Sequence, residues 1–180
     1  MKRGVIFSYV LWPIAVTMGV PVADALKVAE LIGVKIFLNE FASYQRLGVI
    51  IKNMELLNER NTSVPINYLP NGDWSFTLNN GTVVVATYGA FFTEKAKVLC
   101  TYALCGFANI GSIGILLGAM VTILPQRRAD LTSMILTGMV GGNIACFLTG
   151  CFSGRAELKN GTFNVILKAL LSPSALDRRR

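Results

Sequence analysis

Long apolar tracts dominate the chain, and its charged positions gather between them. Residues 98–126 carry no formal charge, and neither do residues 131–154. Each tract is longer than the roughly 20 apolar residues that a helix needs to cross the hydrocarbon core of a bilayer. Only a short polar turn at residues 125–130 separates the two tracts. We therefore expect two transmembrane helices that lie antiparallel to each other.

The first tract contains a polar and glycine-rich interruption, FANIGSIG, at residues 107–114. Each glycine weakens a helix by roughly 1 kcal/mol, and Asn109 and Ser112 add polar groups. We expect the helix to be broken here at mid-membrane, where a broken helix can expose backbone groups to a solute. The alternative is a close-packing face, because Gly114 and Gly118 form a GxxxG motif.

The segment before these tracts is apolar but irregular. Pro13 and Pro21 interrupt residues 4–23, so we do not expect a single straight helix there. Residues 24–48 mix charged side chains with apolar ones, a pattern too polar for a lipid-facing span and too apolar for a loop. A re-entrant helical hairpin fits both facts, since its non-helical tip is tolerated at membrane depth when protein or a wet cavity surrounds it.

Glu40 is the strongest functional candidate among the residues of this hairpin. It follows Asn39 at the end of an apolar run, where a carboxylate is costly unless it meets a cation, a donor or water. With Asn109 and Ser112 it would supply a carboxylate, an amide and a hydroxyl, a set that suits a neutral polyhydroxylated solute. The structural alternative is that Glu40 pairs with Lys35 or caps a helix.

Residues 53–93 are rich in Asn, Gly, Pro and Thr, which predicts an aqueous loop with a β-hairpin near residues 79–81. Glycosylation sequons begin at Asn61, Asn80 and Asn160. Two membrane crossings would place all three on one side. The charge rule conflicts with an external sequon side, because basic residues flank that side more heavily than they flank the opposite turn. These signals leave the orientation open.

Composition sets the class of protein. Hydrophobic residues make up 53% of the 180 residues and charged residues only 15%, against a usual share of about 25%. The absence of histidine excludes Ser-His-Asp and Cys-His catalysis and any His-ligated metal, so we expect no enzyme, no metal site and no cofactor. The net charge of +7 comes without a basic patch interleaved with aromatics, so we expect no nucleic-acid partner.

The four cysteines lie in the apolar tracts as two pairs, each with four residues between its members. This spacing is not that of a zinc or redox motif. We therefore expect them to be small buried hydrophobic residues. Together these features predict an all-α, multi-pass membrane protein in contact with the lipid bilayer.

Three motifs occur together in this chain: GVKIFLNEF at residues 33–41, ALCGFANIGSIGILLG at residues 103–118 and LPQRRADL at residues 124–131. In this order they resemble the C-terminal domain of the concentrative nucleoside transporters. The resemblance covers about residues 5–155, so we expect that domain at residues 1–155 and a polar tail at residues 156–180. It implies the second of two inverted repeats, each with a re-entrant hairpin, a helix unwound at its middle and a final helix.

The resemblance also implies a function. Glu40 would bond to ribose hydroxyls, Asn109 and Ser112 would hold the ribose, and Asn39 would complete the substrate-binding motif. It further implies a sodium-coupled symporter of purine or pyrimidine nucleosides in the plasma membrane, a homotrimer, and an extracellular C-terminus. Sodium would be the coupling ion, with its site in the family's N-terminal half, which nothing here matches. We therefore expect either a fragment of a longer product or a truncated isoform.

Two other functions fit the same sequence. The chain could be a truncated, non-transporting regulatory membrane subunit that associates with a full-length partner through its glycine-rich helices. It could also be a channel-like protein in which Glu40 is the cation-selecting carboxylate.

Overall fold

The computed structural model describes residues 5–70 and 72–171, apart from the side chains of residues 5, 6 and 157–171. Its elements, in chain order, are α1 (Val5–Thr17), α2 (Val22–Phe37), α3 (Glu40–Asn58), β1 (Asn67–Tyr68), β2 (Trp74–Thr77), β3 (Val83–Ala86), α4 (Glu94–Ala103), α5 (Ile110–Ile123), the 3-10 turn η1 (Pro125–Arg127) and α6 (Arg128–Leu171). The described chain is thus mostly helical. The three-stranded sheet corrects the expectation of an all-α protein.

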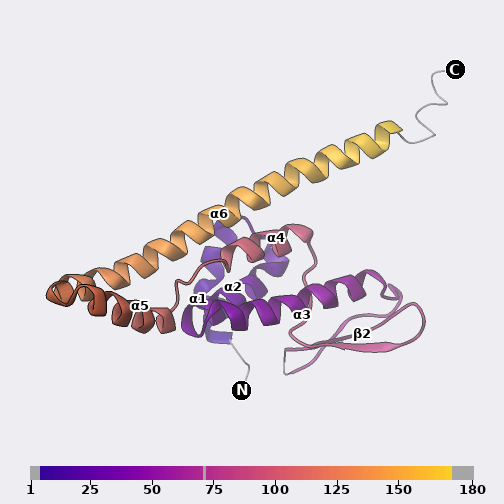
Figure 1. The fold of residues 1–180 in the computed structure, drawn as a ribbon. Coiled ribbons are helices and arrows are strands. Elements are labelled where there is room, and N and C mark those ends of the chain that lie inside the picture. Colours follow the sequence, from indigo (N-terminus) through magenta and orange to yellow (C-terminus); the bar gives the residue numbers. More distant parts are fainter. Residues whose placement is uncertain (1–4, 71, 172–180) are drawn as a thin grey trace.

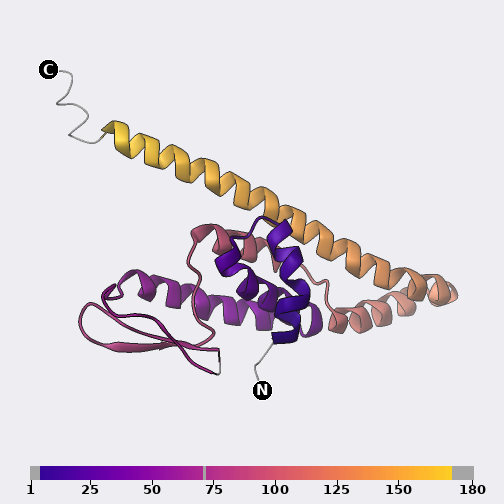
Figure 2. The same cartoon turned by 180° about the vertical axis from the view of Figure 1, so that it is seen from behind.

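The elements divide into a packed body and a protruding helical pair (Figure 1). The buried apolar core joins α1, α2, α3, α4 and the sheet. The sheet lies beside the C-terminal half of α3, while α5 folds back along one end of α6. Seen from behind, α1 lies in front of α2 (Figure 2). No residue of α5 is buried, so the described chain leaves this helix uncovered.

The N-terminal segment bends, but not where the first proline predicts. α1 continues through Pro13, and the chain turns after Thr17 instead. The helix direction changes by 119° between α1 and α2. Gly19 has a φ of +88°, in the left-handed region that favours glycine. Pro21 directly precedes α2, and its ring fixes the backbone φ angle at the start of that helix. The glycine and the second proline therefore make this bend.

Helices α2 and α3 form the expected helical hairpin. Its non-helical tip is Leu38 and Asn39, between the end of α2 and the start of α3. The hydroxyl of Ser43 donates to the Leu31 carbonyl at 2.9 Å, and Arg46 lies 3.5 Å from Glu30. Since the residue farther from the tip in α2 pairs with the residue farther from the tip in α3, the two arms run antiparallel.

The loop after this hairpin folds into an antiparallel sheet with the order β1-β2-β3. The β2–β3 hairpin turns at residues 78–82, as predicted. The backbone N–H of Leu78 donates a hydrogen bond to the Thr82 carbonyl at 2.8 Å, and Gly81 has a φ of +84°. Asn53 in α3 ties the end of the sheet to the helical body, because its amide donates to the carbonyls of Thr87 and Gly89 at 2.9 and 2.8 Å.

The first neutral tract is broken, as the sequence predicts. α4 ends at Ala103 and α5 begins at Ile110, so residues 104–109 are not helical, and Gly106 adopts a φ of +104°. The break begins at Leu104, before the FANIGSIG motif, and it ends inside that motif, because residues 110–114 already belong to α5. Cys105 lies in it and is exposed, which corrects the expectation that all four cysteines are buried. Cys100 is buried, and Cys146 and Cys151 are half-buried.

Helices α5 and α6 form the expected antiparallel pair around η1 (Figure 1). Within the described residues, one continuous helix, over Pro125–Ala156, is long and apolar enough to cross a membrane, while α5 is a shorter apolar helix. The first of the two expected spans is therefore divided between α4 and α5. α6 continues to Leu171, past residue 156 where we placed the start of the tail.

The glycines that pack closely are not those of the predicted GxxxG motif. A Cβ placed at Gly114 or Gly118 would have no atom of the described chain within 4 Å. A Cβ at Gly154 in α6 would lie 2.5 Å from Leu99 Cγ, and one at Gly150 would lie 3.1 Å from the Leu99 carbonyl oxygen. Close packing therefore joins α6 to α4 through a second GxxxG motif, Gly150 to Gly154, which was not predicted as a packing site.

Candidate functional site

Glu40 and Asn109 meet where two helices begin. Glu40 is the first residue of α3, and Asn109 is the N-cap of α5. The Asn109 Nδ2 donates to Glu40 Oε2 at 2.8 Å. Both side chains are buried, with 6% of Glu40 and 3% of Asn109 exposed. The two polar interruptions of the sequence, 69 residues apart, thus form a single site.

The Glu40 carboxylate is stabilised without a basic side chain in contact. The ion pairs among the described residues join Arg46 to Glu30 and Lys97 to Glu94. Glu40 instead accepts the Asn109 amide hydrogen and lies in the first turn of α3, where the helix dipole favours negative charge. The alternative pairing of Glu40 with Lys35 is not found, because the Lys35 ammonium donates to Asn143 Oδ1 at 2.9 Å.

Asn109 and Ser112 form a reciprocal capping box at the start of α5. Asn109 Oδ1 accepts a hydrogen bond from the Ser112 backbone N–H at 2.7 Å, and Ser112 Oγ accepts one from the Asn109 backbone N–H at 3.2 Å. The Ser112 hydroxyl also faces the carbonyls of Phe107 and Asn109 as a donor. Since a hydroxyl has one hydrogen, the main role of Ser112 in this structure is to hold the break.

Asn39 occupies the equivalent position at the other break. Its Oδ1 caps α3 by accepting from the Ala42 amide at 2.8 Å, and its side chain is exposed. The structure therefore brings Glu40, Asn109 and Ser112 together and leaves Asn39 bonded to its own helix. Among the described residues, no group of three or more His, Cys, Asp or Glu side chains could hold a metal ion.

Two exposed aromatic rings stand beside the polar pair. Phe41 follows Glu40, Phe107 precedes Asn109 by two positions, and their ring centroids lie 6.1 Å apart in an edge-to-face arrangement. They are 64% and 71% exposed. No role was predicted from the sequence for Phe41 or Phe107. The sequence signal for these two residues was that each is an aromatic residue close to a polar interruption of an apolar tract.

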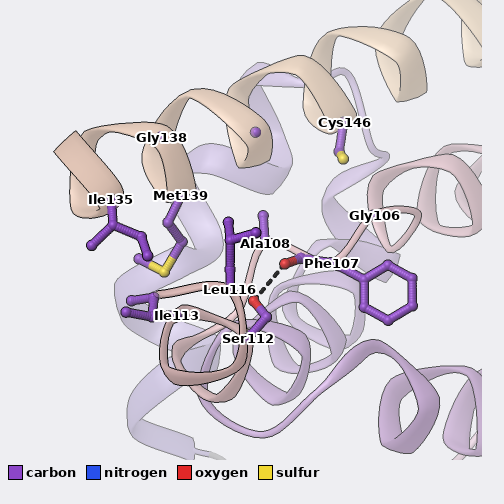
Figure 3. Close-up of a pocket in the computed structure, with 11 residues that line it drawn as sticks. Gly106, Phe107, Ala108, Ser112, Ile113, Leu116, Ile135, Gly138, Met139 and Cys146 are labelled. Carbon is purple, nitrogen blue, oxygen red and sulfur yellow. Dashed lines mark hydrogen bonds between the residues drawn. The ribbon is translucent and has the colours of Figure 1, made fainter. Parts of the chain in front are cut away.

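A cavity of about 430 Å³ begins at the same break and extends between α5 and α6. In Figure 3, Ile113 and Leu116 from α5 face Ile135 and Met139 from α6 across it, and the Ser112–Phe107 hydrogen bond lies at its edge. Glu40 and Asn109 do not line it. Its apolar wall is therefore distinct from the polar pair.

Two of the glycosylation candidates lie at the sheet, which follows the end of α3 opposite to Glu40. Asn61 and Asn80 flank the sheet, and their side chains accept from the backbone amides of Ser63 and Thr82 at 2.9 and 3.0 Å. Asn80 is exposed and Asn61 is half-buried. The side chain of Asn160 lies outside the described residues.

Comparison with known proteins gives the family. Residues 3–154 match the family model described as Na+ dependent nucleoside transporter C-terminus. Solute carrier family 28 member 3 of Eptatretus stoutii is 37% identical over 150 residues, which cover 83% of this chain and 19% of that protein. Sodium/nucleoside cotransporter 1 of Rattus norvegicus is 37% identical over 156 residues, which cover 87% of this chain and 20% of that protein. The chain thus spans about a fifth of the length of these relatives.

Solved structures show the same fold. The structure of CNTnw in an inward-facing substrate-bound state aligns with a TM-score of 0.60 and 25% identity, covering 86% of this chain and 29% of that one. A variant of CNTnw in the intermediate 3 state aligns with a TM-score of 0.61 and 23% identity, covering 84% and 29%. By its match over residues 3–154 and these relatives, the chain belongs to the sodium-dependent nucleoside transporter family, a family of transporters and not of enzymes, of which it carries the C-terminal part.

Proposed function

We propose that this chain provides the ribose-binding part of a sodium-coupled nucleoside symporter. The observation that carries the proposal is the buried hydrogen bond between Asn109 and Glu40, which joins the hairpin tip to the helix break. An amide nitrogen has two hydrogens and a carboxylate about four lone-pair sites, so both groups have capacity beyond their mutual bond. A pair of adjacent ribose hydroxyls, each both donor and acceptor, matches this combination.

This chemistry would select for the sugar. Hydrogen bonds to a charged acceptor are among the stronger ones in proteins, and in a dry site a missing partner leaves the acceptor unsatisfied. A 3′-deoxynucleoside should therefore bind less well than the ribonucleoside. Ser112 contributes by fixing Asn109, and Asn39 by fixing the start of α3 beside Glu40.

Phe41 and Phe107 supply the second kind of contact. Their exposed rings lie next to the polar pair, where an aromatic face can stack on a planar nucleobase. Stacking of this kind tolerates both purines and pyrimidines, because every base has a π-face. The proposed site therefore distinguishes the sugar more strongly than the base.

We place the domain in the plasma membrane, with the hairpin re-entrant and the break between α4 and α5 at membrane depth. Large apolar side chains of α5 and α6 support this placement, for example Ile115 at 78%, Ile123 at 71% and Phe152 at 74% exposure. Lipid or other parts of a transporter would cover them. We further propose a homotrimer, with the sodium site outside this chain. The relatives named sodium/nucleoside cotransporters support sodium as the coupling ion.

The test replaces Glu40 with Gln in a complete transporter. Residues 3–154 would be grafted in place of the matching part of rat sodium/nucleoside cotransporter 1, and uridine and adenosine uptake measured in cells. We expect Glu40→Gln to reduce uptake at low substrate concentration by about tenfold to a hundredfold, because the loss of a charged acceptor costs roughly 1.5–3 kcal/mol.

Glu55→Gln is the matched control, because Glu55 is exposed on the same helix. It should leave uptake unchanged, and surface biotinylation should show equal amounts of each variant. Normal uptake by Glu40→Gln, with ribose still preferred over 3′-deoxyribose, would contradict the proposal. Current without nucleoside that depends on Glu40 would instead favour a channel.

A further inference from the structure

We propose that the Lys35 ammonium is a tethered cation that holds the break between α4 and α5 in its site-forming shape. Lys35 is wholly buried, with 0% exposed, in the last turn of α2. Neither ion pair of the described residues includes it. A buried charge is costly unless its surroundings compensate for it, so its partners define its purpose.

Those partners lie at the break. Lys35 Nζ donates to Asn143 Oδ1 at 2.9 Å and to the carbonyl of Ala103, the last residue of α4, at 3.4 Å. It also lies 5.8 Å from the centre of the Phe147 ring, within cation-π range. One amino group thus contacts the upstream edge of the break and, through Asn143, helix α6.

Asn143 extends this contact to the downstream edge. Its Nδ2 donates to the Ala108 carbonyl at 2.8 Å and to the Met139 carbonyl at 3.1 Å. Because Ala108 directly precedes Asn109, the Lys35–Asn143 pair holds both ends of residues 104–109. The position of Asn109 against Glu40 then depends on a chain of contacts that begins on α2, close to the hairpin tip.

A positive charge suits this place for a general reason. The last carbonyls of a helix have no partner within the helix, and they carry the negative end of its dipole. Lys35 lies at the C-terminal ends of both α2 and α4. An ammonium is a compact charge with three donors, so it can satisfy a carbonyl and an amide oxygen at once. Lys35 is in this sense a positioning residue.

The inference rests on the proposed function only for its effect on nucleoside binding. Its first test needs no nucleoside. Hydrogen–deuterium exchange would be measured by mass spectrometry on the full chain in lipid nanodiscs, following the peptide amides of residues 104–112. We expect Lys35→Met to speed exchange there by about tenfold to a hundredfold, the range for loss of a bond to a charged group. Lys35→Arg should keep most of the protection.

Lys27→Met is the matched control. Lys27 is on the same helix and also donates to a backbone carbonyl, that of Tyr88, but it lies over the Trp74 ring near the sheet. Its replacement should speed exchange near residues 86–89 and leave residues 104–112 unchanged. If Lys35→Met left residues 104–112 as protected as in the wild type, the proposal would be wrong.

Chemical rescue separates a tethered cation from a general packing role. Lys35→Ala removes the atoms of an n-propylammonium ion, so adding n-propylammonium should restore protection of residues 104–112, whereas neutral n-propanol should not. Equal rescue by the two compounds would overturn the role of the charge.

A nucleoside arm distinguishes the two proposals. Uridine added to the wild-type chain should increase protection of residues 104–112, and Lys35→Met should lose that increase. If uridine has no effect on the wild type but Lys35→Met still speeds basal exchange, the tethered cation stands and binding by this chain fails. If uridine protects the wild type and Lys35→Met by the same factor, binding by this chain stands and Lys35 does not position the nucleoside site.

Discussion

Asn39 and Asn109 are the same type of residue in the same local position, yet they do different work. Each follows a non-helical segment and caps the helix after it, accepting from the amide three residues on. Only Asn109 also sends an amide hydrogen to Glu40. The difference arises because α5 begins beside the hairpin tip, whereas the Asn39 side chain is exposed.

This contrast predicts opposite tolerance of aspartate. Asn39→Asp should keep the cap of α3, since Asp caps about as well as Asn, while Asn39→Ala should lower stability by about 1 kcal/mol. Asn109→Asp should be much worse than Asn39→Asp, because it places a carboxylate against Glu40. Thermal unfolding of each variant in the same detergent, followed by circular dichroism, measures this order. Equal melting temperatures for the two aspartate variants would contradict it.

At the scale of the elements, α6 is held to the body through α4. Gly154 and Gly150 leave room for Leu99, which is fully buried, and this lets the two helices approach closely. α5 has no such contact, since Gly114 and Gly118 face open space within the described chain. The GxxxG motif at Gly150 and Gly154 therefore anchors α4, the first half of the broken helix, to α6.

We expect Gly154→Val to destabilise the isolated chain by about 1–3 kcal/mol, because its Cβ would overlap Leu99 in a filled core. Gly118→Val is the control and should change stability by less than about 0.5 kcal/mol, the usual range for open surface positions. Thermal unfolding in detergent compares them. Leu99→Ala should partly relieve Gly154→Val in the double variant, since neighbouring sites couple. Additive losses would show that the two residues do not meet.

At the scale of the whole molecule, the sheet and the site lie at opposite ends of α3. Glu40 is its first residue, while Asn53, in its last two turns, holds the sheet. If the hairpin tip lies at membrane depth, the sheet with Asn61 and Asn80 lies outside the hydrocarbon. We expect this side to lie outside the cell, as the family resemblance implies, although the basic residues that flank it would favour the cytoplasm.

Asn80 should then carry a glycan in eukaryotic cells, because it is exposed at the tip of the β2–β3 hairpin. Glycosidase treatment should increase gel mobility, and Asn80→Gln should remove most of that shift. Asn79→Gln, which leaves the sequon intact, is the control. Labelling of a Gly161→Cys variant by an impermeant reagent on intact cells should place the C-terminal part of α6 on the same side. Labelling only after permeabilisation would contradict this orientation.

The sequence by itself determined the local features of this protein. Charge-free length marked the apolar helices, glycine and asparagine marked the break, and Asn-Asn-Gly marked the β-hairpin. Each of these rests on neighbouring residues, whose backbone preferences act over a few positions. The motifs around Glu40 and Asn109 also identified both parts of the candidate site, since burying a polar group in an apolar tract costs free energy in any fold.

Tertiary structure alone decided which distant groups meet. Glu40 could bond to Lys35, close by on the chain, or to Asn109, 69 residues away, and no local preference separates these outcomes. Packing of α4 on α6 brings Asn143 to Lys35, so the ammonium donates to this amide oxygen and forms no ion pair with Glu40 among the described residues. The same packing decides which GxxxG motif is filled and leaves Cys105 exposed in the break. Contacts of this kind depend on how helices fit together in space, which spacing along the chain does not encode.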